Sequence, residues 1–166
     1  MKFEEFSPTD YRYAVEELRE YLSEGAFLRY KARVEAAIAE VFCQRGLLSA
    51  ALAREIQEAA SKVSPEEVYE EEKRTKHDIR ALVNVMKRKV SDDAKPFVHL
   101  CATSYDIVDT ANALRYRDAV EEVIIPDMKA LERVWLKLTR REKETLQIGR
   151  THGQHAEPIT FGFALA

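Results

Sequence analysis

A helical pattern extends with a single interruption from Asp106 to Arg140. Apolar residues recur every three or four positions across this segment, and it contains no glycine, which predicts one long helix. Pro126 should kink that helix, because a proline in a helix interior removes one backbone hydrogen bond. A helix of ~35 residues is about 50 Å long, too long to bury its apolar face within one small domain. The segment therefore requires partner helices, and its expected buried positions are Ile107, Ala111, Leu114, Val123, Met128, Leu131, Trp135 and Leu138.

The rest of the chain is also predicted to be mainly helical. The whole chain has only 5 glycines and 5 prolines in 166 residues, and its apolar positions are spaced by three and four, so the predicted fold class is all-α. The sequence Ser64-Pro65-Glu66-Glu67 is typical of a capping box with a proline at the first helical position. Thr75 is the expected cap of the following helix, whose apolar face would be Ile79, Leu82, Val83 and Met86.

A polar segment that ends in proline, residues 91–96, is the predicted domain boundary. An N-terminal helical domain would then cover residues 1–95, and residues 96–166 would begin a domain built from long helices. The sequence stops on an apolar run directly after the last expected helix start, within residues 160–166. We therefore expect the chain to be truncated.

Composition and charge argue against several classes of protein. Lys and Arg number 26 against 29 Asp and Glu, a net charge of -3 without blocks of like charge, so no nucleic-acid partner is expected. The sequence lacks an apolar run of signal-peptide or membrane-spanning type, so we expect a soluble, cytoplasmic protein without a membrane partner. Cys43 and Cys101 lie in apolar contexts and are predicted to be small buried thiols.

Residues Gly149 to Pro158 form the densest cluster of polar chemistry in the sequence. The run includes Thr151, His152 and His155 and is expected to be a structured loop, neither helix nor strand, because its glycines and proline interrupt regular structure. Polar loops on a rigid scaffold are often functional sites. Taken alone, however, the run could equally be a solvated turn.

Three further polar clusters precede this run, and the four clusters together resemble a known family. They are Arg12-Tyr13, Thr75-Lys76-His77-Asp78, Thr103-Ser104-Tyr105-Asp106 with the following Ile107 to Ala111, and Gly149 to Pro158. Their order resembles the motifs of the fumarase/aspartase superfamily and, within it, of the adenylosuccinate lyase family. The likeness spans residues 12 to 158.

The resemblance implies an all-α fold in which long helices form a central bundle of the fumarase/aspartase type. It also implies a homotetramer whose active sites are shared between subunits, and a nucleotide as the small-molecule substrate. The implied reaction is β-elimination of fumarate from adenylosuccinate, giving AMP, and from the succinylcarboxamide ribotide of purine biosynthesis. No cofactor is implied. The family's base is a serine expected beyond Ala166, so this chain alone is predicted to be inactive.

Two other functions remain open from the sequence. A different fumarate-releasing lyase of the same superfamily would share the fold. A non-catalytic helical module that assembles through its long helix would share the pattern of apolar residues without the chemistry.

Two histidines are the candidate catalytic residues. His152 is the expected general acid, because an imidazole, with an ordinary pKa of ~6.5, holds and releases a proton near neutral pH. The alternative is that His152 only orders its loop. By resemblance Thr151 contacts the succinyl group. His77 would support charge and proton transfer at a helix start, unless it is merely a capping residue on the surface.

The remaining candidates are expected to bind substrate. By resemblance Lys76 and Asp78 line the site beside His77, although Lys76 replaces the family's usual arginine and cannot make a bidentate contact. Thr103 and Ser104 place two hydroxyls at a helix N-terminus, which suits a substrate carboxylate. The alternative there is ordinary capping by Ser104 or Asp106. Many relatives have glycine where this chain has Cys101.

The nucleotide end of the substrate is assigned to the start of the chain. Arg12 and Tyr13 match the family's phosphate-binding pair, and a guanidinium beside a phenol suits a phosphate monoester. A terminal segment that packs against the core would explain the same residues. His99 and His155 are expected to orient loops. No metal is expected, because His152 and His155 have no cysteine or carboxylate at ligand spacing.

Overall fold

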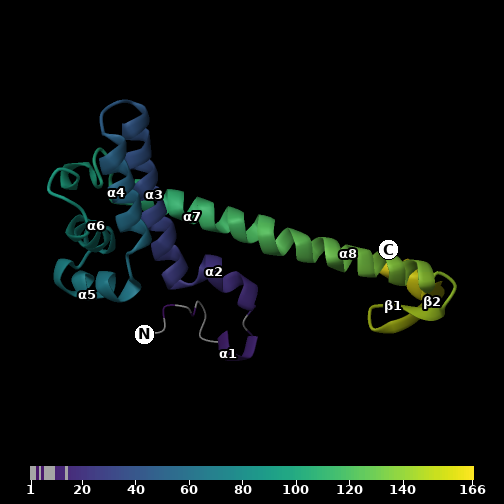
Figure 1. The fold of residues 1–166 in the computed structure, drawn as a ribbon. Helices are drawn as coiled ribbons and strands as arrows, with labels where there is room; N and C mark the ends of the chain where they lie inside the picture. The colour runs from purple at the N-terminus through teal and green to yellow at the C-terminus, as the bar shows by residue number, and fades with distance from the viewer. Residues whose placement is uncertain (1–2, 4, 6–9, 14) are drawn as a thin grey trace. The chain divides into compact units, whose positions relative to one another are not determined.

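The computed structural model describes residues 3, 5, 10–13 and 15–166, and confirms the all-α fold class (Figure 1). The α-helices are α1 (Asp10–Tyr13), α2 (Arg19–Leu22), α3 (Glu24–Gln44), α4 (Ala50–Ser61), α5 (Pro65–Thr75), α6 (Asp78–Arg88), α7 (Ser104–Ala119), α8 (Ile125–Arg141) and α9 (Phe161–Leu165). Short 3₁₀ turns occupy Glu16–Leu18 and Lys95–Phe97, and a π-helix occupies Val120–Ile124. Two strands, β1 (Leu146–Thr151) and β2 (Gln154–Thr160), form a small antiparallel sheet.

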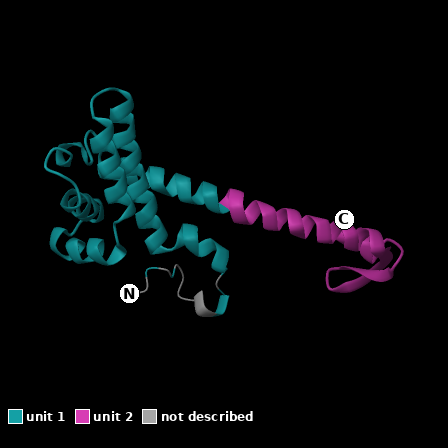
Figure 2. Ribbon diagram, in the orientation of Figure 1, with its two compact units in different colours: residues 1–119 teal, residues 120–166 magenta. Residues whose placement is uncertain are grey.

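The chain divides into two compact units, residues 1–119 and 120–166 (Figure 2). The division falls at Ala119, within the predicted long helix and not at the polar segment 91–96. This division reflects only which residues contact one another within this chain, and it does not test where a domain of the whole protein ends. The domain boundary near residue 95 therefore stays a prediction.

The core of the first unit lies between α3, α4, α6 and α7. Its largest fully buried apolar side chains are Ile56, Ile79, Leu82, Met86 and Ile107. The predicted apolar face of α6 is confirmed, because all four of its members are at most 1% exposed. Burying each such side chain stabilises the fold by about 1.5–3 kcal/mol.

The junction between α5 and α6 differs in part from the prediction. The capping box is confirmed: the Ser64 hydroxyl accepts from the Glu67 N–H, and the Glu67 carboxylate accepts from the Ser64 N–H. Thr75 was wrongly predicted as the cap of α6, since it is the last residue of α5. Lys76 follows with φ +53, so the chain turns there and His77 becomes the N-cap.

The long helical segment is confirmed, because every residue from Ser104 to Arg141 is helical. The kink predicted at Pro126 stays a prediction; a π-helix lies immediately before α8, which has Pro126 in its first turn. A proline lacks the N–H that continues the regular ladder, and wider hydrogen bonding is one way a helix adjusts. The side chains of Ile107 and Ala111 are buried as expected.

Several apolar positions of α8, which are expected to be buried by partner helices, are exposed in this chain. Met128, Leu131 and Trp135 are 64%, 51% and 53% exposed. Together with Ile125 they line a shallow apolar groove. A helix that extends past its own domain exposes this face unless another element covers it.

Residues 149–158, expected to be a loop, form most of a β-hairpin, so that prediction is wrong. Thr151 pairs with Gln154 and Leu146 with Thr160, with an irregularity between Ile148 and Arg150. His152 and Gly153 have φ +51 and +73, and positive φ at both central residues is what a tight type I′ hairpin turn requires. The glycine signal therefore marked a hairpin turn.

Two smaller features complete the fold. Cys43 is half-buried and Cys101 is exposed, so the expectation of buried thiols is wrong for Cys101. Its φ of +59 belongs to an irregular segment before α7. Among the described residues, none of the helices combines the length and apolar character needed to cross a bilayer.

Candidate active site

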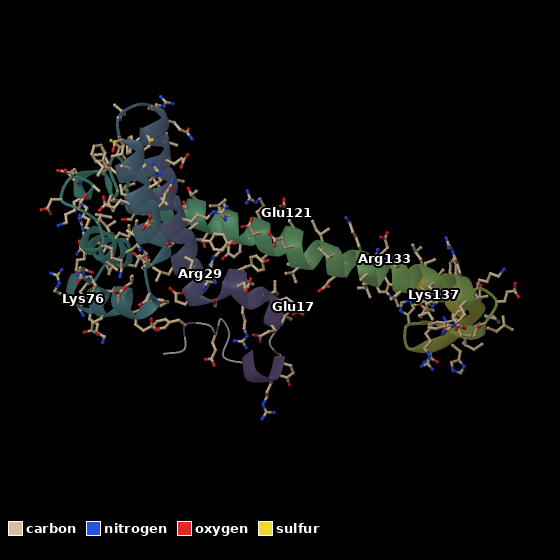
Figure 3. The ribbon with its side chains drawn as sticks, in the orientation of Figure 1. Glu17, Arg29, Lys76, Glu121, Arg133 and Lys137 are labelled. Atoms are coloured by element: carbon tan, nitrogen blue, oxygen red, sulfur yellow. The ribbon has the colours of Figure 1, made fainter. Side chains whose placement is uncertain are left out.

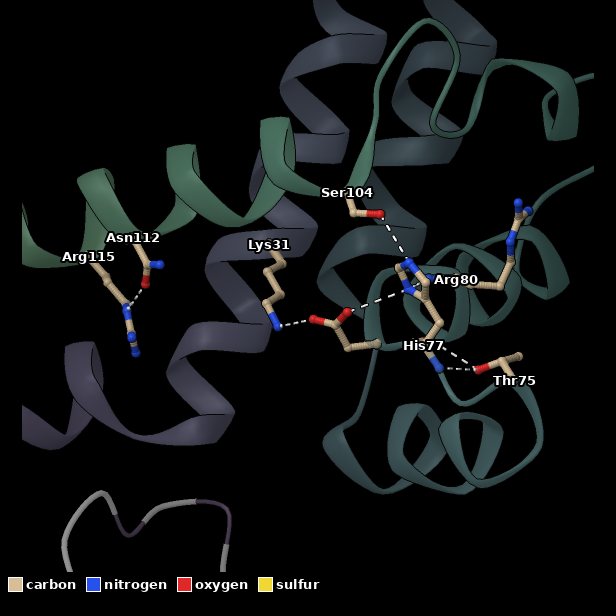
Figure 4. A network of polar contacts seen from close by, with 8 residues as sticks. Lys31, Thr75, His77, Arg80, Ser104, Asn112 and Arg115 are labelled. Carbon is tan, nitrogen blue, oxygen red and sulfur yellow. Dashed lines mark hydrogen bonds and ion pairs between the residues drawn. The ribbon is translucent and has the colours of Figure 1, made fainter.

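The start of α6 and the start of α7 meet through His77 and Ser104. Nε2 of His77 lies 3.2 Å from the Ser104 hydroxyl oxygen, and Figure 4 shows the contact between the two helix starts. These residues are 27 positions apart in the chain and belong to two of the four predicted clusters. The fold therefore brings these two clusters together.

Backbone contacts fix the orientation of the His77 ring. Its Nδ1 atom accepts a hydrogen bond from the Arg80 N–H at 3.3 Å, and the Thr75 hydroxyl contacts the His77 backbone N–H and carbonyl. A neutral imidazole that accepts at Nδ1 carries its proton on Nε2. In that state Nε2 donates to Ser104, and the side chain remains 49% exposed to solvent.

Lys31, a residue that the sequence analysis did not select, pairs with Asp78. Its ammonium lies 2.9 Å from Oδ2 of Asp78. Partial burial tends to raise the pKa of Asp78, but the hydrogen bond and charge of Lys31, with smaller effects of the Ile79 N–H and His77, hold it below its usual range. One signal was present: Lys31 interrupts the apolar face of α3, four residues after Phe27. We call Lys31, His77, Asp78 and Ser104 the His77 cluster.

The N-terminus of α7 is capped by Asp106. Its carboxylate accepts from the Thr103 N–H at 2.8 Å, as one of the alternatives for this cluster anticipated. Ser104 instead contacts His77 and is half-buried, while Thr103 is exposed. The contact from Asp106 thus leaves the Thr103 side chain exposed, whereas the Ser104 hydroxyl is held by His77.

A second histidine, His99, is held by a buried carboxylate on α3. Its Nδ1 lies 2.6 Å from Oε1 of Glu35, whose side chain is completely buried. Burial raises the pKa of Glu35, and the contact with His99 opposes this shift. The other oxygen, Oε2, has no hydrogen-bond partner among the described residues. His99 thereby anchors the segment before α7, which agrees with its expected role in orienting a loop.

The other predicted site residues lie apart from the His77 cluster in the contacts of the first unit. Arg12 and Tyr13 are exposed in α1, and Lys76 is exposed at the α5–α6 junction, where Figure 3 labels it. No hydrogen bond or ion pair within residues 10–13 and 15–119 joins these three side chains to the cluster. Their assignment to the substrate stays a prediction.

Thr151 and His152 lie in the second unit, at the tip of the hairpin. Both are exposed, and His152 begins the turn between the strands. A short, well-paired hairpin holds an imidazole at a defined position while leaving it open to a ligand. His155 pairs with Arg150 across the strands. In the part of the chain that the structure describes, no three metal-ligating side chains come together.

Comparison with known proteins identifies the family. A family model described as "Lyase" matches residues 5–166. Adenylosuccinate lyase of Methanocaldococcus jannaschii is 40% identical over 161 residues, 96% of this chain and 35% of the relative. The enzyme of the same name from Archaeoglobus fulgidus is 38% identical over 159 residues, again 96% of this chain and 35% of the relative.

Two solved structures share the fold. The 3-carboxy-cis,cis-muconate lactonizing enzyme from Pseudomonas putida has a TM-score of 0.86 at 27% identity, with 95% of this chain and 37% of that chain covered. A fumarate lyase from Mesorhizobium sp. BNC1 has a TM-score of 0.80 at 29% identity, over 90% of this chain and 36% of that chain. This chain spans about a third of the length of the curated relatives it matches. The chain belongs to the lyase family, within the fumarase/aspartase superfamily.

Proposed function

We propose that the protein is an adenylosuccinate lyase, a carbon–nitrogen lyase that eliminates fumarate from adenylosuccinate to give AMP. The same chemistry would act on the succinylcarboxamide ribotide of purine biosynthesis. The observation that carries the proposal is the 38–40% identity to archaeal adenylosuccinate lyases across 96% of this chain. The contact between His77 and Ser104 supports it, because it joins two of the clusters on which the resemblance rests.

The elimination needs a group that protonates the departing nitrogen. We assign this role to His152, because an exposed imidazole can hold a proton and release it in the reaction. His77 supports the charge that develops on the substrate, through the Nε2 proton that its backbone contacts favour. The bond from carbon to nitrogen breaks, the proton on the adjacent carbon leaves to a base, and fumarate and an amine result.

The substrate's charged ends require separate partners. Thr103 and Ser104 offer hydroxyls at the N-terminus of α7, where the helix dipole favours a carboxylate. Thr151 would contact the same succinyl group. Lys76 and Asp78 would line the site beside His77, and Arg12 with Tyr13 would bind the phosphate of the nucleotide.

We also propose assembly as a homotetramer with active sites shared between subunits. Support comes from the apolar face of α8, where Met128, Leu131 and Trp135 are each more than half exposed. An exposed apolar stripe of this kind is typical of an interface. We expect the enzyme to act in the cytoplasm, with a nucleotide as its only small-molecule partner and without a cofactor.

The test is turnover by the full-length protein, followed as fumarate release from adenylosuccinate, the carboxamide ribotide analogue and argininosuccinate, and as lactone formation from a carboxymuconate. Turnover of the first two and not the others would support the proposal. Turnover confined to another substrate would identify a different lyase of the superfamily, and no turnover at all would favour a non-catalytic helical protein. The 166-residue chain alone should release no fumarate, since it covers 35% of its relatives.

A further inference from the structure

Lys31 is a buried ammonium group on α3. Its side chain is 7% exposed, and Nζ lies 2.9 Å from Oδ2 of Asp78. The same nitrogen lies 4.0 Å from the centroid of the Phe27 ring. A buried ammonium destabilises a fold unless it is paired. Within the described residues its ion-pair partner is Asp78, a residue that the resemblance assigns to the active site.

Asp78 connects this ammonium to the imidazole of His77. Oδ2 of Asp78 accepts from Lys31, whereas Oδ1 lies 3.6 Å from Nδ1 of His77. On the opposite edge of the ring, Nε2 contacts Ser104 at 3.2 Å. The four side chains thus form one series from α3, through the start of α6, to the start of α7 (Figure 4).

The charge of Lys31 determines whether the Asp78 carboxylate draws a proton onto Nδ1 of the His77 imidazole. While the positive charge of the ammonium compensates the negative charge of the Asp78 carboxylate, Nδ1 of His77 can stay unprotonated and accept the hydrogen bond from the Arg80 N–H. Without the ammonium, an uncompensated carboxylate beside Nδ1 favours a proton on that nitrogen. The hydrogen bond from Arg80 would then be lost, and the ring would no longer present Nε2 to Ser104 in the same way.

The neighbouring groups do not replace Lys31 in this role. Tyr69 on α5 interacts with Asp78, and its pKa is raised by burial, by a hydrogen bond to Glu24 and by the charges of Glu24, Glu72 and Asp78. A phenol with a raised pKa stays neutral at physiological pH. Three other cations lie nearby: Arg115 is 4.0 Å from the Phe27 ring that Lys31 also contacts, and Lys76 and Arg80 belong to the α5–α6 junction. Among the described residues, however, the ion-pair partners of Asp78 are Lys31 and His77.

We propose that Lys31 is a positioning residue of the lyase site, acting through Asp78 to hold the His77 imidazole with its Nε2 edge toward Ser104 and the substrate. The inference rests on the proposed function, but Lys31 lies outside the four motifs that carry the resemblance to the family. Lys31 itself touches neither the substrate nor the reacting atoms.

The experiment is steady-state kinetics of the full-length enzyme with Lys31→Met. We expect kcat to fall about 10- to 100-fold, because a small displacement of a catalytic group slows the reaction by this order of magnitude. The KM for adenylosuccinate should change less than about threefold, because the substrate contacts remain. The acidic limb of the kcat/KM profile should move to higher pH. Lys31→Arg, which keeps the charge, should recover most of the rate.

A double-mutant cycle with Asp78→Asn separates positioning from a loss of folding. If Lys31 acts through Asp78, Lys31→Met will have little further effect on kcat in the Asp78→Asn background. Unfolding of the same variants in urea should show the same coupling, independently of activity. Lys31→Gln replaces Lys31→Met if the latter does not fold.

Two outcomes would overturn the inference: a kcat within about twofold of wild type in Lys31→Met, or equal losses from Lys31→Met with and without Asp78. An inactive wild-type protein that still shows coupling on unfolding would count against the proposed function, not against the contact. An inactive wild-type protein without that coupling would overturn both.

Discussion

At the scale of single residues, the hairpin imidazole offers the most direct test of the chemistry. His152→Ala in the full-length protein should lower kcat by about 10²- to 10⁴-fold, the usual contribution of a general acid. Stability should change little, because His152 is exposed at a turn and contributes nothing to the core. The measurement is fumarate release together with the urea unfolding midpoint.

His155→Ala is the matched control, since His155 lies in the same hairpin and is also exposed. Its effect on kcat should be much smaller, because we assign it only to orientation of the hairpin. Equal losses in the two variants would show that the hairpin needs its shape and not the His152 proton.

A buried carboxylate on α5 predicts how stability depends on pH. Hydrogen bonds from Arg74, Asn84 and Arg88 lower the pKa of Glu71 from 4.5 to about 2. A carboxyl whose pKa is lower in the folded state stabilises the fold above its unfolded pKa, and this stabilisation is lost as the pH falls toward the folded pKa. Wild type should therefore exceed Glu71→Gln in stability at neutral pH, and the difference should shrink between pH 4.5 and about 2.

Urea unfolding of both proteins across that range measures the effect. Glu70→Gln, on the same helix, removes a carboxylate that is 74% exposed in its pair with Lys73, and should change stability little at any pH. A difference between wild type and Glu71→Gln that stays constant down to about pH 2 would contradict the role of Glu71.

At the scale of elements, the caps of α5 and α6 define the junction that carries His77. Ser64→Ala removes the hydroxyl that accepts from the Glu67 N–H and should destabilise the fold by about 1 kcal/mol. Ser64→Asp should keep most of that stability, because aspartate also caps helices. Chemical denaturation of the three proteins provides the measurement.

Ser61→Ala serves as the comparison, since its hydroxyl donates to a carbonyl at the exposed end of α4 and caps no N-terminus. Ser61→Ala should lower the free energy of unfolding by less than Ser64→Ala does. The capping assignment would be wrong if both alanine variants lost the same stability.

At the scale of the whole molecule, the apolar face of α8 predicts assembly. Leu131→Glu and Trp135→Glu should weaken or abolish the proposed tetramer of the full-length protein, because burial of each native side chain at an interface would contribute about 1.5–3 kcal/mol. Sedimentation velocity at several protein concentrations measures the change. Activity should fall in parallel if the active sites are shared between subunits.

Arg133→Glu is the control on the same helix, where the charged side chains Arg133 and Lys137 extend from the ribbon (Figure 3). Arg133→Glu reverses the charge of a side chain that does not line the apolar groove, so it leaves the groove unchanged. Tetramers that persist in Leu131→Glu and Trp135→Glu would mean that another surface holds the assembly.

The sequence by itself determined the main helices and the family. Spacing of apolar residues is a local signal, so it predicted the helices, the buried face of α6 and a long helical segment from Asp106 to Arg140, close to the observed Ser104 to Arg141. The capping box at Ser64 was equally local, because its partners are three residues apart. The order of four motifs identified the superfamily, since motifs are properties of the chain and not of its fold.

Tertiary structure alone decided which side chains meet. Lys31 and Asp78 are 47 positions apart, and Glu35 and His99 are 64 apart, so no local pattern joins them. The hairpin was missed because a polar turn and a polar loop have similar composition, and only pairing across the strands distinguishes them. The N-cap of α6 is His77 and not Thr75, because α5 extends to Thr75 and the chain reverses direction at Lys76, where φ is +53. A charged residue within an apolar helical face becomes informative only when packing shows which opposite charge it meets.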